Sequence, residues 1–305
     1  METTLECGQV PTERDGDPVR RSISQLLLPP GGLADVLYAG FARDTRGCDL
    51  SSEERFNFFG ATPLCGFTLI FDGSCFVPGS NLGRHDSRSI APLPKVSLSG
   101  PQTRPAMSWS PGPLHAVIIG FYPHRLDALT GLQPSEVTDK TIDVADVRSE
   151  WCCELLRAAH ATGDAKLAYA LICNGLEQNQ VSDTIGISSS SRRLKDWSRM
   201  LAIRAAQSGV GRSARQVQRR FQTLTGQSNR DLSKLVRADN AFQIAVQSFH
   251  DDGSSIADIA SQAGYSDQAH MSRDVRDQTG FSPADLMRRI ETEEPFWCYR
   301  LAAQL

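Results

Sequence analysis

The sequence has no long apolar run. Its longest, AVIIGFY at 116–122, is far shorter than the roughly 20 residues that a membrane helix needs. The first 21 residues, METTLECGQVPTERDGDPVRR, also lack the apolar segment that follows a basic start in a secretion signal. The sequence therefore predicts a cytoplasmic protein with no membrane partner.

The eight cysteines lack the spacing of a metal site or of a disulfide framework. No CxxC and no Cys/His pattern is present, so we expect free thiols, no metal and no cofactor. Cys65 and Cys75 lie ten residues apart in a predicted hairpin, which leaves a redox pair as an alternative. His85 and Asp86 stand in GRHDSRS without a spaced partner, so an exposed turn is expected there rather than a metal site.

Motifs of enzymatic chemistry are also missing. There is no GxSxG, no P-loop and no paired metal-ligand motif. A nucleic-acid-modifying enzyme would need a nucleophile, for which Cys48 and Cys65 are the candidates, and only Cys48 has arginines nearby, Arg43 and Arg46. We therefore expect a protein that is not an enzyme.

Glutamate is absent between residues 192 and 290. That region holds 16 lysine and arginine residues against 10 aspartates, a formal charge of +6, which leaves −9 for the rest of the chain. The whole-chain charge of −3 hides this division. A basic region of this kind predicts contact with an anionic polymer.

The basic region contains an internal repeat. The stretch GRSARQVQRRFQTLTGQSNRDL aligns with GYSDQAHMSRDVRDQTGFSPADL at an offset of 54 residues. The offset pairs Phe221 with Val275, Thr225 with Thr279, Gly226 with Gly280, Ser228 with Ser282, Asp231 with Asp285 and Leu232 with Leu286. A repeat of this length predicts two copies of one supersecondary unit.

The pattern of the chain predicts an α+β protein in two parts. Short apolar segments separated by Gly, Pro and Ser clusters predict antiparallel strands over 22–122, and helical periodicity follows over 124–178. In the last of these helices we expect Leu167, Ala170, Leu171 and Leu176 to share the apolar face. The expected domains are a β-rich sensing or dimerisation domain at 1–178, a Ser-rich linker at 179–193, a helical domain at 194–292 and a tail at 293–305.

The helix starts in the helical domain are marked by N-capping serines. Ser213, Ser228, Ser255 and Ser282 are each followed three residues later by Gln or Asp. These signals predict helices over 194–208, 214–225, 229–250, 255–263, 267–279 and 283–292. Each repeat then forms a helix-turn-helix unit, and the long middle helix carries an apolar stripe that would hold the two units apart.

The second helix of each unit has an inward apolar face and an outward polar face. Val217, Phe221 and Leu224 point inward in the first unit, and Met271 and Val275 in the second. Arg and Gln side chains match the edges of guanine and adenine in the major groove. The outward candidates for DNA contact are Arg215, Gln218 and Arg219 with Arg220 at the margin, and Gln268, His270, Ser272 and Arg273 with Arg276 at the margin. Asp267, Asp274 and Asp277 reduce the positive charge of the second helix.

These residues resemble the tandem helix-turn-helix domain of AraC/XylS-type transcription regulators. The resemblance covers about 195–290 and is carried by SIADIASQAGYSDQAHMSRDVRDQTGFSPADL. Met271 and Val275 stand where the family usually has Phe. The resemblance implies a transcription regulator that binds double-stranded DNA. Activation, with RNA polymerase as a further partner, is one expectation, and the sequence leaves repression open as the alternative.

The N-terminal part is similar to the sensor-like domain of one subgroup of these regulators, through VSLSGPQTRPAMSW and FYPHRLDALTGLQPSEVTDKTIDVADV. The similarity implies control by a small-molecule effector of unknown identity or by self-association as a homodimer. Two other interpretations stay open: an architectural DNA-binding protein without a sensor role, and a nucleic-acid-modifying enzyme.

Overall fold

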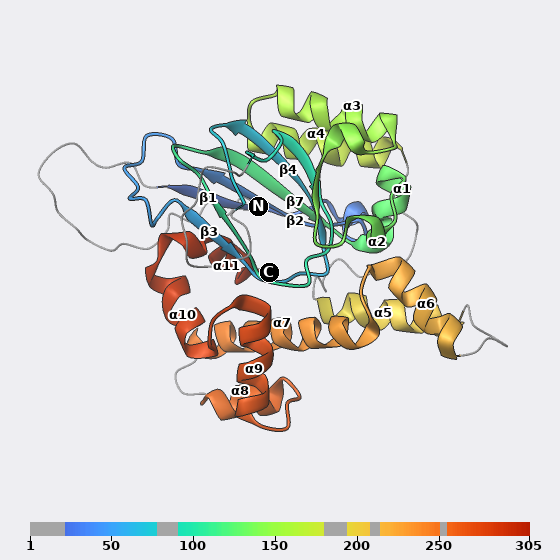
Figure 1. Cartoon of the computed structure of the whole chain (residues 1–305), viewed down its shortest axis with the longest axis vertical. Coiled ribbons are helices and arrows are strands. Elements are labelled where there is room, and N and C mark those ends of the chain that lie inside the picture. Colours follow the sequence, from blue (N-terminus) through green and yellow to red (C-terminus); the bar gives the residue numbers. More distant parts are fainter. Residues whose placement is uncertain (1–21, 78–90, 180–193, 208–213, 251–254) are drawn as a thin grey trace, which may run out of the picture.

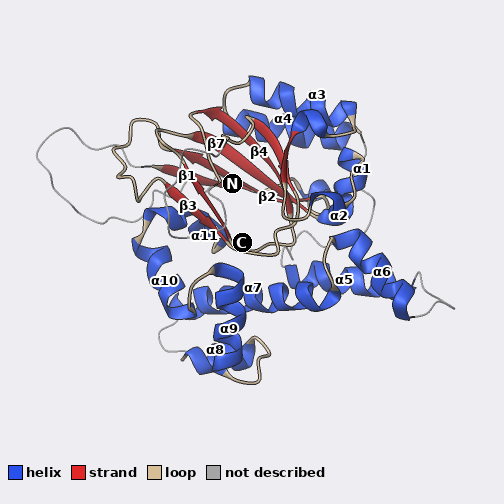
Figure 2. Ribbon diagram, viewed as in Figure 1, coloured by secondary structure: helices blue, strands red, loops and turns tan. Residues whose placement is uncertain are grey.

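The computed structural model describes residues 22–77, 91–179, 194–207, 214–250 and 255–305. Figure 1 shows a β-sheet with helices on both sides, and Figure 2 separates the strands from the helices by colour. The strands are β1 (Ile23–Leu27), β2 (Leu37–Asp44), β3 (Phe56–Phe59), β4 (Cys65–Asp72), β5 (Val96–Ser99), β6 (Ala106–Trp109), β7 (His115–Phe121) and β8 (Thr141–Asp143). The α+β class predicted from the sequence is confirmed.

The helices of the N-terminal part are η1 (Gly31–Leu33), η3 (Pro123–Arg125), α1 (Leu126–Thr130), α2 (Pro134–Val137), η4 (Val144–Asp146), α3 (Glu150–Ala161) and α4 (Ala165–Gln178). Those of the C-terminal part are α5 (Leu194–Gln207), α6 (Ala214–Thr225), α7 (Asn229–His250), α8 (Ile256–Gln262), α9 (Gln268–Thr279), α10 (Pro283–Thr292), η5 (Glu294–Phe296) and α11 (Trp297–Ala302). The helix bounds predicted for the C-terminal part agree with these to within a residue.

The main sheet has six strands in the order β1-β2-β7-β4-β5-β8, and β3 pairs with β6 in a second, two-stranded sheet. The central strand β7 is antiparallel to both β2 and β4. Side chains alternate between the two faces of a strand. On β7 this alternation sends Val117, Ile119 and Phe121 to one face and Ala116 and Ile118 to the other, and almost all of them are buried. Both faces of the sheet therefore need a cover.

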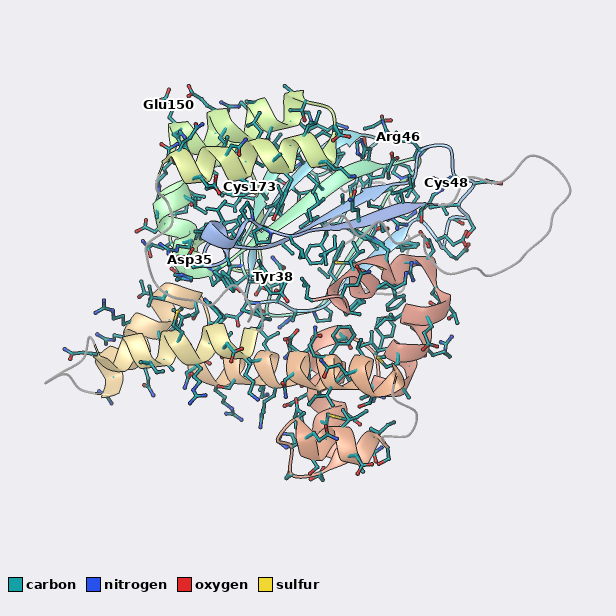
Figure 3. All side chains as sticks on the ribbon, turned by 180° about the vertical axis from the view of Figure 1, so that it is seen from behind. Asp35, Tyr38, Arg46, Cys48, Glu150 and Cys173 are labelled. Carbon is teal, nitrogen blue, oxygen red and sulfur yellow. The ribbon has the colours of Figure 1, made fainter. Side chains whose placement is uncertain are left out.

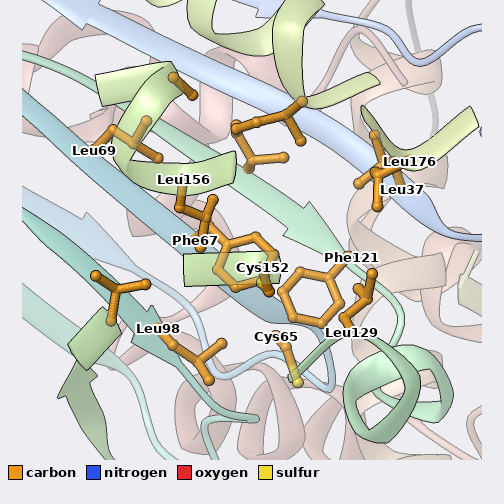
Figure 4. Close-up of a cluster of buried hydrophobic side chains, with 14 of the residues drawn as sticks. Leu37, Cys65, Phe67, Leu69, Leu98, Phe121, Leu129, Cys152, Leu156 and Leu176 are labelled. Atoms are coloured by element: carbon orange, nitrogen blue, oxygen red, sulfur yellow. The ribbon is translucent and has the colours of Figure 1, made fainter. Parts of the chain in front are cut away.

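Helices α3 and α4 cover one face (Figure 1). Figure 4 shows the resulting core, in which Phe67 and Phe121 lie together with Leu69 and Leu156. The two phenyl rings stack with centroids 4.6 Å apart. This core buries the apolar side chains that the strands carry on this face of the sheet.

The predicted apolar face of α4 is confirmed at Leu176, which is buried, and at Leu171, which packs against the core, but it is wrong at the other two residues. Leu167 is 61% exposed and Ala170 is exposed, whereas the buried side chains are those of Ala165, Ala168, Tyr169, Ile172, Cys173 and Leu176. The reason is a close approach to the sheet: a Cβ at Gly40 of β2 would lie 3.0 Å from ring carbons of Tyr169. An alanine- and tyrosine-bearing face fits over that glycine, so hydrophobicity alone did not identify the face.

The C-terminal helices cover the opposite face of the sheet. Figure 3 shows Tyr38 on the side of these helices and Cys173 on the other side, within α4. Trp197 of α5 is 1% exposed, and its ring stacks on Tyr122 with centroids 5.4 Å apart. Its indole N–H donates to Nδ1 of His124 at 3.1 Å. The two parts of the chain thus share one apolar core.

The last residues, expected as a tail, fold as η5 and α11 and join the same interface. Phe296 is fully buried and stacks on Phe58 of β3 at 5.0 Å. The indole of Trp297 donates to Oδ1 of Asn57 at 2.8 Å and lies 5.1 Å from the Arg43 guanidinium. The predicted linker, except Asn179, lies outside the described residues, as does the segment around His85.

The shared core predicts a large cost for truncating Trp197. We expect Trp197→Ala to lower the free energy of unfolding by about 3–5 kcal/mol, because it leaves a cavity between the two parts. Leu167→Ala, on the exposed side of α4, is the matched control and should change it by less than about 0.5 kcal/mol. Urea unfolding of both variants measures this, and equal losses would contradict the assignment of the core.

Candidate nucleic-acid interface

The sequence repeat corresponds to a turn between two helices that occurs twice, between α6 and α7 and between α9 and α10. Gly226 and Gly280 have φ of +71° and +84°, the left-handed conformation that ends a helix and favours glycine. The hydroxyl of Thr225 donates to the carbonyls of Phe221 and Gln227, and that of Thr279 makes the equivalent bonds to Val275 and Phe281. The repeated residues therefore build the turn and do not themselves point to DNA.

The capping serines predicted from the sequence lie at the helix starts. Ser228 accepts from the backbone N–H of Asp231 at 3.2 Å, and Ser282 accepts from that of Asp285 at 3.3 Å. Ser255 forms a reciprocal capping box with Asp258. Ser213 lies outside the described residues. These local bonds fix where each helix begins, and so which side chains face outward.

Helix α7 separates the two helix-turn-helix units. It has 22 residues, which corresponds to a length of about 33 Å. Leu232 and Val236 pack with Phe221 of α6 near one end, whereas Ala241 and Ala245 pack in the cluster of Met271 and Val275 of α9 toward the other. Figure 1 shows α6 and α9 at separate places along this helix. The two units therefore pack at different positions along one continuous helix.

The polar candidates on α6 are accessible. Arg215, Gln218, Arg219 and Arg220 are all exposed, and Phe221 is buried as predicted. The side chain of Val217 lies outside the described part of the structure. The C-terminal end of α6 approaches α2, where a Cβ at Gly226 would lie 2.6 Å from Oγ1 of Thr138. The arginines of α6 precede that contact and remain open to a partner.

The candidates on α9 divide into two groups. Gln268, Arg273 and Arg276 are exposed, whereas His270 and Ser272 are half-buried. His270 packs edge-on against Tyr265, with ring centroids 5.3 Å apart, and its Nε2 lies 3.7 Å from Asp274. Two arginines and a glutamine of α9 are therefore exposed to a partner, whereas the histidine packs against the rest of the protein.

Two of the three aspartates on this segment have structural partners. Asp267 is the N-cap of α9 and accepts from the backbone N–H of His270 at 2.7 Å. Asp274 is 4% exposed and lies 3.4 Å from the guanidinium of Arg237 on α7. Burial, followed by the charge of Asp274, raises the pKa of Tyr265. Asp277 alone of the three projects outward without such a partner in the described structure.

Arg237 is a residue that sequence reasoning missed. It ties α9 to α7 through Asp274, and its guanidinium lies 5.0 Å from the ring centroid of Tyr265. The signal was present, because Asp274 lies three residues after Met271 and next to Val275, on the inward face. An acid at such a position predicts a buried basic partner on a neighbouring helix.

The alternatives at Cys65 and Cys75 receive no support from the surroundings of these two thiols. Cys65 and Cys75 are buried and free, and burial raises the pKa of both thiols. A raised pKa disfavours the thiolate that a nucleophile or a redox pair needs. The described residues contain no group of three or more His, Cys, Asp or Glu side chains able to hold a metal ion. Among the described helices, none is long and apolar enough to span a membrane.

We expect the two aspartates of α9 to affect different properties, Asp274 the stability and Asp277 the DNA affinity. Asp274→Asn should lower the free energy of unfolding by about 1–3 kcal/mol, because it removes a buried charged acceptor. Asp277→Asn should leave stability within about 0.5 kcal/mol and strengthen DNA binding on every sequence alike, because its carboxylate repels phosphate. Urea unfolding and DNA titration at one salt concentration test both. An unchanged stability of Asp274→Asn would contradict the structural role.

Comparison with known proteins gives a match over this region. A family model described as a helix-turn-helix domain, of the variety found in AraC-type regulators, matches residues 208–289. No curated protein sequence matches the chain.

Among solved structures, ToxT from Vibrio cholerae O395 has 9% identity, covers 76% of this chain and 92% of its own, and gives a TM-score of 0.37. A second crystal form of ToxT from Vibrio cholerae has 10% identity, 78% and 95% coverage, and a TM-score of 0.37. The assignment rests on the domain match alone: residues 208–289 match a helix-turn-helix domain of the AraC type, the kind of domain that binds DNA.

Proposed function

We propose that this protein binds DNA sequence-specifically by inserting α6 and α9 into two successive major-groove segments on one face of the duplex. The observation that carries the proposal is the pair of repeat-related units, each with exposed Arg and Gln side chains, at separate places along α7. One chain would then cover an asymmetric site.

The candidate residues fall into two chemical roles. Arg215, Gln218 and Arg219 on α6, and Gln268 and Arg273 on α9, would contact base edges. Arg220 and Arg276 would contact phosphates, which position the protein without specifying sequence. His270 and Ser272, which are half-buried on α9, would make further contacts with the DNA. The basic charge of residues 192–290 supports this assignment.

We further propose that a small molecule controls DNA binding through the N-terminal domain. The support is a cavity of about 850 Å³ between the main sheet and the C-terminal helices. This volume is within the range of pockets that hold drug-sized ligands. An architectural protein without a sensor role has no need for such a cavity, so the cavity favours the regulator. Activation, contact with RNA polymerase, self-association and a cytoplasmic location stay predictions.

The two recognition helices should be separable by mutation. We expect Arg219→Ala and Arg273→Ala each to weaken binding by about 1–3 kcal/mol and to relax base preference in one half-site only, a different one for each variant. The measurement is a binding-site selection with each purified variant. If both variants relax the same base pairs, or relax none, the arrangement of two recognition helices is wrong.

Arg220→Ala and Arg276→Ala are the matched controls, since they remove the same side chain from the same helices at marginal positions. Each of these variants should lower the DNA affinity on all sequences alike. Each should also reduce the slope of log affinity against log salt by about one in magnitude. A change of base preference in these variants would contradict the division into base and phosphate contacts.

Binding by the whole chain should depend steeply on salt. With roughly 6 to 10 phosphate contacts, log affinity should fall against log salt with a slope of about −5 to −9. Titration of a labelled operator at several salt concentrations measures this slope. A slope near zero would exclude DNA binding of the proposed kind.

A further inference from the structure

The two recognition helices carry different charges. Helix α6 contains three arginines and no acidic residue, a formal charge of +3. Helix α9 contains two arginines and two aspartates, so its formal charge is zero while its histidine is neutral. Because phosphate contacts supply much of the affinity for DNA, α9 gains less from the backbone of the duplex than α6 does. Within α9, His270 is the group that can change this balance near neutral pH, since the ordinary charge change of histidine falls between about pH 5 and 8.

His270 lies in the first turn of α9, as its third residue. The N-terminal residues of a recognition helix are those that contact base edges. The imidazole packs edge-on against the ring of Tyr265, with centroids 5.3 Å apart, and its side chain is still 33% exposed. The ring is therefore held in place and remains open to solvent, so it can gain or lose a proton without a change in the fold.

The neighbours of the two ring nitrogens accept either protonation state of His270. Nε2 lies 3.7 Å from Oδ2 of Asp274, a carboxylate that attracts a positive ring. Nδ1 lies 3.4 Å from Oγ of Ser266. A hydroxyl can donate to a neutral ring nitrogen or accept from a protonated one. The ring can therefore take up its second proton without losing either neighbour.

The nearest charges act on His270 in both directions. Asp274 favours the positive ring, and so does Asp267, whose pKa is lowered by the hydrogen bond from the backbone N–H of His270. Arg237 of α7, which lies 3.4 Å from Asp274, opposes it, as does the positive end of the helix dipole in this turn. Burial raises the pKa of Tyr265, so the phenol beside the ring stays neutral.

The charged groups farther from the ring add little to either side. Arg273 and Asp277, later in α9, are both exposed and carry opposite charges. Asp258 of α8 is held by Ser255 at the start of that helix, and Asp285 of α10 is paired with two arginines of its own helix. The phosphates of a bound duplex add negative charge around the first turn of α9, and this charge favours the imidazolium.

We propose that DNA binding by α9 is coupled to the uptake of one proton at His270, which makes the second recognition helix positively charged and its half-site dependent on pH. The proton changes the formal charge of α9 from zero to +1, in the turn that enters the groove. Because the protonated form binds more tightly, operator affinity is highest below the titration range of histidine and falls as the pH rises through it. The inference rests on the proposed DNA binding and adds a regulation of the second half-site.

The test is a titration of the full-length protein with an operator selected at pH 7, carried out at pH 6 and pH 8. We expect binding to be about 2- to 5-fold tighter at pH 6, the effect of one exposed ion pair. The slope of log affinity against log salt should also be steeper at pH 6, by up to about one. An operator with only its α9 half-site scrambled should show neither difference.

Three variants separate the charge of His270 from other effects of pH. His270→Gln cannot gain the charge and should bind equally at both pH values. His270→Lys carries the charge permanently, so at pH 8 it should bind about as tightly as the unmodified protein does at pH 6. His160→Gln, on α3 at the opposite face of the sheet, is the matched control and should keep the full pH dependence.

Equal affinity of the unmodified protein at pH 6 and pH 8, or tighter binding at pH 8, overturns the coupling and leaves DNA binding standing. Persistence of the pH dependence in His270→Gln, or on the operator with the scrambled α9 half-site, overturns it as well. Loss of the pH dependence in His160→Gln assigns the proton to another site and also overturns it. A protein that selects no operator at any pH overturns the proposed function itself.

Discussion

The structure depends on one constraint: the six-stranded sheet is apolar on both faces. Strands β2 and β7 are buried along almost their whole length, so covering one face with α3 and α4 leaves the second face in need of a partner. The C-terminal helices supply it through Trp197 and Trp297. The DNA-binding domain is therefore part of the cover of the sheet, and the two parts of the chain are not independent units joined by a tether.

This packing has a consequence for DNA recognition. Helix α7 links α6 and α9, but the N-terminal domain also contacts this region: η3 and α2 contact α6, and β3 contacts η5 and α11, which follow the second unit. Phe58 of β3 stacks on Phe296 and meets Phe281 edge-on at 5.5 Å, next to the end of α9. A change in the N-terminal domain can thus reach the second recognition helix through direct contact, without passing along the linker.

Local chemistry made the DNA-binding domain predictable from sequence. Ser228, Ser255 and Ser282 cap helices by bonds within a few residues, and Gly226 and Gly280 end helices by their own backbone conformation, so no knowledge of the rest of the fold was needed. The outward positions of α6 and α9 followed from helical periodicity once those ends were fixed.

The features that the sequence did not reveal depend on distant partners. The buried face of α4 is set by Gly40 on a strand more than a hundred residues away, and the last helix is ordered by Asn57 and Phe58. The partner of Asp274 is Arg237 on another helix. The cavity is lined by residues of neighbouring strands and of the C-terminal helices, which no one-dimensional pattern brings together. Such features can be predicted only once the topology is known, because the topology determines which distant residues come into contact.

The central claim is that one chain presents two recognition helices to one face of the DNA. Hydroxyl-radical footprinting of the intact protein on its selected operator tests this most directly, because it maps each protected stretch of backbone to a position around the duplex. The account predicts two protected stretches on the same face, with centres about 10 bp apart. A single protected stretch, or two on opposite faces of the duplex, would contradict it.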